Sequence, residues 1–158
     1  MSEIEVIIDP DVRERVRECS IASHPLNGRS IESAVRAAAS VGGCDDCRVG
    51  VRVTNDKVIH QINRDFLDHD FPTDVISFPY ELTPPMVEGE LVVSIDTAIA
   101  QAPDAGWSIA EELLLYVIHG TLHLVGFDDI ADADRAAMRN AESKALSLLF
   151  PRSDSLTA

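Results

Sequence analysis

Residues 116–129 read Tyr-Val-Ile-His-Gly-Thr-Leu-His-Leu-Val-Gly-Phe-Asp-Asp and contain two histidines four residues apart in an apolar run. On a helix this spacing places both imidazoles on one face, one turn apart, as two ligands of one metal ion require. Gly126 can adopt the left-handed conformation that ends a helix. The chain can then turn back and offer Asp129 as a third ligand. The pattern H-x-x-x-H-x-x-G-x-x-D therefore predicts a metal site of His119, His123 and Asp129.

Each of these residues also has a purely structural interpretation. The two histidines can be core residues that hydrogen-bond to the backbone, and Asp129 can cap a helix that begins near Ala131. We favour the metal site, because an unpaired imidazole is costly to bury and this helix gives few other reasons to hold two. The spacing is similar to that of metzincin-type zinc proteases, but Gly120 stands where those enzymes carry the glutamate that serves as general base. Peptide hydrolysis is therefore not expected.

The sequence of this stretch resembles the signature motif of a known family. Residues 119–128 are similar to the H-G-x-L-H-L-x-G-[YF]-D-H motif of the YbeY family of bacterial metal-dependent single-strand endoribonucleases and rRNA maturation factors. Residues 72–79, Pro-Thr-Asp-Val-Ile-Ser-Phe-Pro, resemble the family's P-T-D-V-L-S-F-P, and residues 89–102 contain a third, shorter block. The resemblance runs from about Val51 to about Leu149, in the family's order.

Two positions depart from the family pattern. The family's third metal-binding histidine falls on Asp129, and a carboxylate is also a ligand of zinc. The family carries an arginine, considered important for activity, in the loop before P-T-D-V. Leu67 occupies that position here, and Arg64 lies nearby. The resemblance therefore supports the fold and the metal site better than catalytic power.

Four further residues are candidates for catalysis: Asp128, Asp74, Ser77 and Arg64. Asp128 can orient a ligand or a water, because a ligating histidine usually donates its other N–H to a nearby acceptor. The resemblance alone implies that Thr73, Asp74 and Ser77 line the cleft. A turn that precedes a strand is the structural alternative for Thr73 and Asp74.

Together these motifs predict an enzyme, a metal-dependent single-strand-specific endoribonuclease in rRNA maturation, processing and ribosome quality control. The expected cofactor is one zinc ion, with another divalent metal as the alternative. The expected partner is RNA, either an rRNA precursor or RNA in the ribosome. A ribosomal protein is a further candidate partner. Binding to DNA or to a membrane is not expected.

Two other functions stay open. A ribosome-associated maturation factor with little nuclease activity is favoured by Leu67 and by the net charge of −14. A non-haem metal hydrolase or oxygenase of another substrate is also consistent, since two histidines and one carboxylate form iron sites as well.

Composition places the chain among ordinary globular proteins. It has 158 residues, of which 46% are hydrophobic and 25% charged, and no apolar run approaches the length of a membrane span. The acidic start shows no secretory signal, so a cytoplasmic location is expected. The net charge of −14 argues against a large basic surface for nucleic acid. We expect residues 1–150 to form a single metal-dependent hydrolase domain and residues 151–158 to form a polar tail.

The chain has three cysteines, and Cys44 and Cys47 form a C-x-x-C pair. Such a pair can be half of a zinc site or a redox centre. No second pair completes a zinc site, and the stretch lies between glycines and a predicted strand rather than at the start of a helix. We interpret the two as incidental thiols in a turn.

Periodicity predicts about four strands and five or six helices, and therefore an α+β fold. Its small mixed sheet is expected to pack on helices around a central metal-binding helix. The expected caps are Asp11, Ser30, Asn55 and Ser108, the last in a capping box with Glu111. Strands are predicted at 3–8, 48–54, 75–78 and 90–94, and helices at 11–19, 31–41, 56–66, 95–105, 109–125 and 132–150.

Overall fold

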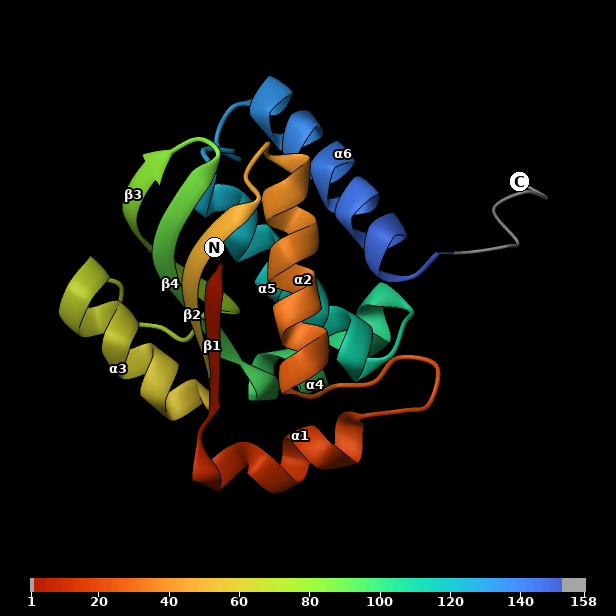
Figure 1. Ribbon diagram of the computed structural model, residues 1–158. Coiled ribbons are helices and arrows are strands. Elements are labelled where there is room, and N and C mark those ends of the chain that lie inside the picture. The colour runs from red at the N-terminus through yellow and green to blue at the C-terminus, as the bar shows by residue number, and fades with distance from the viewer. Residues whose placement is uncertain (1, 152–158) are drawn as a thin grey trace.

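Four strands form one mixed sheet in the order β1-β2-β4-β3 (Figure 1). In this computed structural model, which describes residues 2–151, β1 and β2 are parallel, β2 and β4 are parallel, and β3 runs antiparallel to β4. The strands span Glu3–Ile8 (β1), Asp46–Thr54 (β2), Val75–Thr83 (β3) and Met86–Ser94 (β4). The α+β prediction is confirmed. The predicted polar tail lies, from residue 152 onward, outside the described residues.

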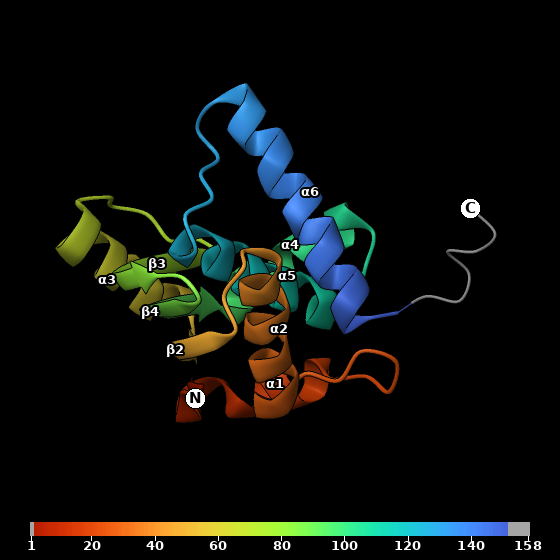
Figure 2. The same cartoon turned by 45° about the horizontal axis from the view of Figure 1, so that its top comes forward.

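Six α-helices and a short 3-10 helix at Pro10–Val12 accompany the sheet within residues 2–151. Helix α5 contacts β3 and β4 on one side and α2, α4 and α6 on the others (Figures 1 and 2). Its apolar residues on nearly every face are buried, as a central helix requires. The helices span Arg13–Cys19 (α1), Gly28–Val41 (α2), Asp56–Leu67 (α3), Ile95–Ala105 (α4), Ile109–Leu124 (α5) and Asp132–Leu149 (α6).

The start of α5 is fixed by the predicted capping box. The Ser108 hydroxyl accepts the Glu111 N–H at 3.1 Å, and the Glu111 carboxylate accepts the Ser108 N–H at 3.0 Å. The neighbouring Glu112 is buried and accepts from the indole of Trp107 at 2.6 Å and from the hydroxyl of Tyr116 at 2.8 Å. These bonds set the register of α5, and with it the position of the residues in its last two turns.

Two predicted caps are wrong. Helix α2 begins at Gly28 and is capped by Asn27, whose side chain accepts the Ser30 N–H at 2.9 Å. Ser30 is therefore the third residue of the helix, and its hydroxyl accepts the Asn27 N–H at 3.0 Å. Asp11 lies inside the 3-10 helix and does not cap α1, whose first residue follows Val12. Helix α2 therefore begins earlier than the apolar pattern indicated, whereas α1 begins later, after the 3-10 helix.

Strands β3 and β4 are longer than predicted and form one hairpin. Pro84 and Pro85, which interrupt the apolar pattern, make the turn between them. Glu81, Glu88 and Gly89 pair within this hairpin in spite of their low strand propensity, because the neighbouring strand supplies their hydrogen-bond partners.

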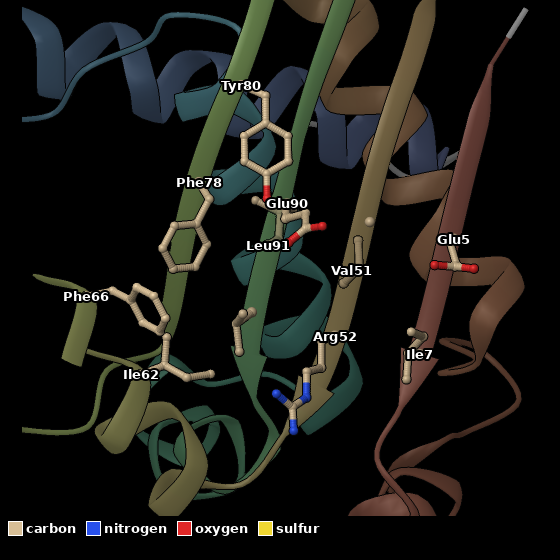
Figure 3. Close-up of a pocket in the computed structure, with 12 residues that line it drawn as sticks. Glu5, Ile7, Val51, Arg52, Ile62, Phe66, Phe78, Tyr80, Glu90 and Leu91 are labelled. Carbon is tan, nitrogen blue, oxygen red and sulfur yellow. The ribbon is translucent and has the colours of Figure 1, made fainter. Parts of the chain in front are cut away.

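The face of the sheet opposite α5, here called the outer face, is covered only in part by α3. Ile59 of α3 packs on Ile76 and Val92 in a small second cluster. Beside it lies an open groove of about 500 Å³ (Figure 3). Phe66 of α3 is 71% exposed at the wall of this groove. The groove is lined by apolar and acidic side chains that include Ile7, Ile62, Phe78, Tyr80, Glu5 and Glu90.

Cys44 and Cys47 are both buried in the main core, and burial raises the pKa of both thiols. A raised thiol pKa disfavours the reactive thiolate. No helix within residues 2–151 combines the length and apolarity that a membrane span needs.

Candidate metal centre

The end of α5 and the segment after it bring three potential ligand atoms together. The Nε2 atoms of His119 and His123 lie 3.1 Å apart. An oxygen of Asp129 lies 3.3 Å from the first of these nitrogens and 3.5 Å from the second. No other group of three histidine, cysteine or acidic side chains within residues 2–151 converges in a way that could hold an ion.

These separations fit a small tetrahedral ion. Bonds of about 2.0–2.1 Å to nitrogen and oxygen place neighbouring ligand atoms of a tetrahedral zinc site about 3.3–3.4 Å apart. The three separations, 3.1, 3.3 and 3.5 Å, fall around this value. Three protein ligands leave a fourth position open, as catalytic zinc sites do. The donor set therefore suits a divalent ion that also binds water or substrate.

Hydrogen bonds on the far side of each ring leave the Nε2 atoms available to an ion. Nδ1 of His123 lies 3.0 Å from the carbonyl oxygen of Phe127, and Nδ1 of His119 lies 2.6 Å from a carboxylate oxygen of Glu142. The carbonyl oxygen of Phe127 can only accept a hydrogen bond, and so can the ionised carboxylate of Glu142. Each Nδ1 is therefore the protonated nitrogen of its ring. In a neutral imidazole the Nε2 lone pair is then free to bind metal.

The turn that returns the chain to the histidines depends on Gly126. Helix α5 ends at Leu124, and Gly126 has φ 102°, in the region that favours glycine. The Phe127 N–H then donates to the Leu122 carbonyl at 2.9 Å, which closes the helix end. The predicted helix stop at Gly126 is confirmed, and the reversal carries Asp129 back toward His119 and His123.

The capping interpretation of Asp129 is wrong. The residue before α6 is Ala131, and no side chain caps the start of that helix. Asp129 instead lies beside both imidazoles, and its own N–H donates to the Asp128 carboxylate at 2.7 Å.

The surroundings of His119 act on its charge in opposite directions. Burial lowers the pKa of His119, but the hydrogen bond and the negative charge of Glu142, with the charges of Asp129 and Asp74, raise it further than burial lowers it. The pKa of His119 therefore lies above its usual value. The same negative field would attract a metal cation to this place.

A cleft of about 500 Å³ opens over the three ligand atoms. Two of the predicted catalytic residues, Asp74 and Ser77, line it. The Asp74 carboxylate accepts the Val75 N–H at 2.7 Å, and the Ser77 hydroxyl donates to the Gly120 carbonyl at 3.1 Å. The lining residues are Leu67, Asp74, Val75, Ile76, Ser77, Pro79, His119, His123 and Asp129.

The cleft does not contain the other two candidates. Asp128 lines a separate hollow beside Phe127, because the chain after Gly126 sends neighbouring side chains to different sides. Arg64 is exposed on α3, and its Nε atom lies 3.6 Å from the carboxylate of Asp65. Leu67, at the end of the same helix, lines the cleft instead. No lysine or arginine of residues 2–151 is among the residues that line it.

Gly120 marks the closest approach of α5 to the sheet. A Cβ at this position would lie 2.9 Å from side-chain atoms of both Leu91 and Val75, and 3.2 Å from the Ser77 hydroxyl. The sheet therefore fills the space that a side chain at position 120 would need. A glutamate at this position, as in the zinc proteases, would collide with β3 and β4.

Glu142 was not found from the sequence. It lies on α6, far along the chain from His119, and a single glutamate on an amphipathic helix is ordinarily a solvent-exposed residue. No local spacing linked it to the histidines.

Comparison with known proteins agrees with the motifs. The model of a family described as endoribonuclease YbeY matches residues 15–149. A protein of Rhodopirellula baltica is 61% identical over 121 residues, which cover 75% of this chain and 62% of that protein. A protein of Chloroflexus aurantiacus is 38% identical over 132 residues, which cover 74% of this chain and 86% of that protein. Both relatives are named endoribonuclease YbeY.

A solved structure shows the same fold. The solution structure of a Thermotoga maritima protein superimposes with a TM-score of 0.63 at 23% sequence identity, covering 98% of this chain and 93% of that one. The family match extends over most of the chain and includes the helix that carries both histidines. This chain belongs to the endoribonuclease YbeY family.

Proposed function

We propose that this chain is a metal-dependent, single-strand-specific endoribonuclease that acts in rRNA maturation, processing and ribosome quality control. We assign one zinc ion to His119, His123 and Asp129, in one hydrolase domain that ends near residue 150. The observation that carries the proposal is the convergence of three donor atoms, 3.1–3.5 Å apart, at the base of an open cleft. Family membership supplies the class of reaction.

A divalent ion in such a site lowers the pKa of bound water and stabilises negative charge on a phosphate. The side chains around it divide the remaining tasks. Asp74 is the other carboxylate in the cleft, and its bond from the Val75 N–H fixes its orientation, so we assign it the role of proton acceptor. Ser77 ties β3 to the last turns of α5 through the Gly120 carbonyl. Asp128 holds the backbone of Asp129.

The charge distribution favours delivery of RNA by a larger particle over unaided capture. The chain carries a net charge of −14, and no cation of the described residues lines the cleft. Binding through phosphates alone would be weak. An rRNA precursor within a ribosomal particle, with or without contact to a ribosomal protein, therefore fits better than free RNA. With such a substrate, we expect the protein to act in the cytoplasm.

Purified protein and short labelled oligonucleotides test the activity. We expect cleavage of single-stranded RNA, but not of DNA or of duplex RNA. Chelator should abolish cleavage and added zinc should restore it, and His123→Ala should be inactive. Cleavage of equal rate in His119→Ala would contradict the proposal. Elemental analysis of protein purified without added metal distinguishes zinc from iron, and so separates a nuclease site from an oxygenase site.

A second candidate is a maturation factor that binds ribosomal particles and cleaves little by itself. Leu67 in the cleft wall favours it, because an apolar side chain there leaves the scissile phosphate without a protein cation. Binding of the metal-loaded protein to ribosomal particles, without cleavage of any single-stranded RNA, would establish this alternative.

A further inference from the structure

We infer that Glu142 positions His119 for metal binding and thereby makes helix α6 a working part of the metal centre. The inference rests on the proposed assignment of His119 as a ligand. It adds a residue outside the ligand set, from an element that the sequence motif does not reach.

The contact between the two side chains is short and sheltered. Oε2 of Glu142 lies 2.6 Å from Nδ1 of His119, and the two side chains are 18% and 26% exposed. This separation is typical of a strong, charge-assisted hydrogen bond. Nδ1 and Nε2 stand on opposite sides of the ring, so a carboxylate on Nδ1 both keeps the proton there and aims Nε2 at His123 and Asp129.

The two histidines are held by different means. Nδ1 of His123 bonds to the carbonyl of Phe127, a backbone group in the turn that ends α5. This partner is local and belongs to the backbone, so it does not depend on a side chain from another element. His119 instead depends on a side chain that comes from α6, beyond Asp129 in the chain. The orientation of His119 is thus the one that distant packing controls.

Packing of α6 brings Glu142 to its place. Helix α6 lies along α2 and α5 (Figures 1 and 2) and buries Met138, Ala141 and Ala145. Glu142 directly follows one of these buried residues, and the small alanine side chains allow the helices to lie close together. The loop that leads into α6 carries Asp129. One end of α6 is therefore tied to the third ligand and its middle to the first.

Metal binding and docking of α6 should consequently stabilise each other. A ligand that binds only the conformation with α6 in place favours that conformation, and the converse also holds. The alternative is that the contact between Glu142 and His119 only fastens α6 to α5. In that case its loss would weaken the fold and leave metal affinity unchanged.

The experiment compares zinc affinity with the stability of metal-free protein in full-length variants. We expect Glu142→Ala to weaken zinc binding, measured by competition with a chromophoric chelator, by about 10–100-fold. Glu142→Gln keeps an acceptor oxygen but not the charge, so its loss should be smaller. Asp134→Asn removes an exposed charge from the same helix and should bind zinc like wild type. Wild-type affinity in Glu142→Ala, with a lowered Tm of the metal-free protein, would overturn the inference.

Hydrogen exchange measures the coupling without reference to activity. Zinc should slow amide exchange in residues 138–145 of wild type, and should slow it less in Glu142→Gln. The glutamine variant replaces the alanine variant in this comparison if the alanine variant does not fold. Equal slowing in both proteins would contradict the coupling. If wild type binds no zinc, the proposed function fails together with this inference. If wild type binds zinc and every Glu142 variant binds it equally, only the inference fails.

Discussion

Among single residues, Asp129 carries the departure from a three-histidine site. It supplies a charged oxygen, so its loss removes both a ligand and a negative charge. We expect Asp129→Ala to bind zinc much more weakly than wild type, and Asp129→His to retain binding because imidazole also ligates zinc. Asp129→Asn should fall well below wild type, because the amide keeps the size of the side chain but not the negative charge of the carboxylate. Zinc titrations decide, and wild-type affinity in both the alanine and the asparagine variants would remove Asp129 from the site.

Gly120 makes a second residue-level prediction. An added methyl group would meet Leu91 and Val75 at 2.9 Å, so we expect Gly120→Ala to lower the free energy of unfolding by about 1–3 kcal/mol. Gly28→Ala is the matched control, because a Cβ there has no neighbour within 4 Å and alanine favours a helix. Urea denaturation measures both. A Gly120→Ala protein as stable as Gly28→Ala would show that α5 can move away from the sheet without loss.

Leu67 tests whether a missing cation limits the contact with RNA. Leu67→Arg places a positive charge in the cleft wall, where Leu67 is 41% exposed. We expect tighter binding of single-stranded RNA and a steeper salt dependence, with a slope larger by about 0.7 for one added phosphate contact. Leu148→Arg makes the same charge change on α6 at a side chain that is 60% exposed and outside the cleft. Fluorescence anisotropy at several salt concentrations should separate the two variants, and equal slopes would refute a local effect.

The convergence of the three candidate ligands can be predicted from the sequence because their geometry is local. A helical turn relates His119 to His123, and one glycine reversal relates both to Asp129. Glu142 was not predictable, since its contact with His119 depends on how α6 docks. Closeness in sequence also does not show which side chain enters the cleft, and Leu67 rather than the nearby Arg64 lines it.

Among the elements, α5 depends most on its first turn. The Ser108 hydroxyl satisfies a backbone donor there, so we expect Ser108→Ala to destabilise the protein by about 1 kcal/mol. Ser147→Ala is the control, because its exposed hydroxyl only returns a bond to the carbonyl of Ser143. Thermal unfolding followed by circular dichroism compares the variants. Equal Tm values for the two would show that the buried contacts of Glu112 are sufficient to fix the helix start.

Elements with strong local signals were predicted most closely. Helix α5 has a capping box and buried residues on nearly every side, and α3 has Asn55 as a working cap. The sequence alone does not show where α2 begins, because both Asn27 and Ser30 are good caps and only the folded backbone shows which one stands outside the helix. The predicted ranges of β3 and β4 are shorter than the strands themselves, because pairing between the strands overrides the local propensity of their residues.

At the scale of the whole molecule, β3 separates two hollows of different chemistry. Ser77 and Pro79 face the metal cleft, whereas Phe78 and Tyr80 face the groove on the outer face, which also carries Glu5 and Glu90 (Figure 3). The alternation of side chains along one strand produces this division. The groove contains no group of residues that could hold an ion within residues 2–151. Only the cleft side therefore combines an opening with ligand atoms.

The short span of chain from residue 119 to 129 has a consequence for the denatured ensemble. Because all three donors lie within one brief stretch, an unfolded chain can close that loop around zinc at small entropic cost. Affinity for the unfolded state subtracts from the stability that metal adds to the native state. Zinc titrated into urea-unfolded wild type should bind more weakly than to native protein, yet more tightly than to urea-unfolded His119→Ala. At saturating zinc, the Tm should then rise by less than the affinity of the native protein for zinc would produce if the unfolded chain bound none. A chain emerging during synthesis could hold the ion before the sheet and α6 have closed around it.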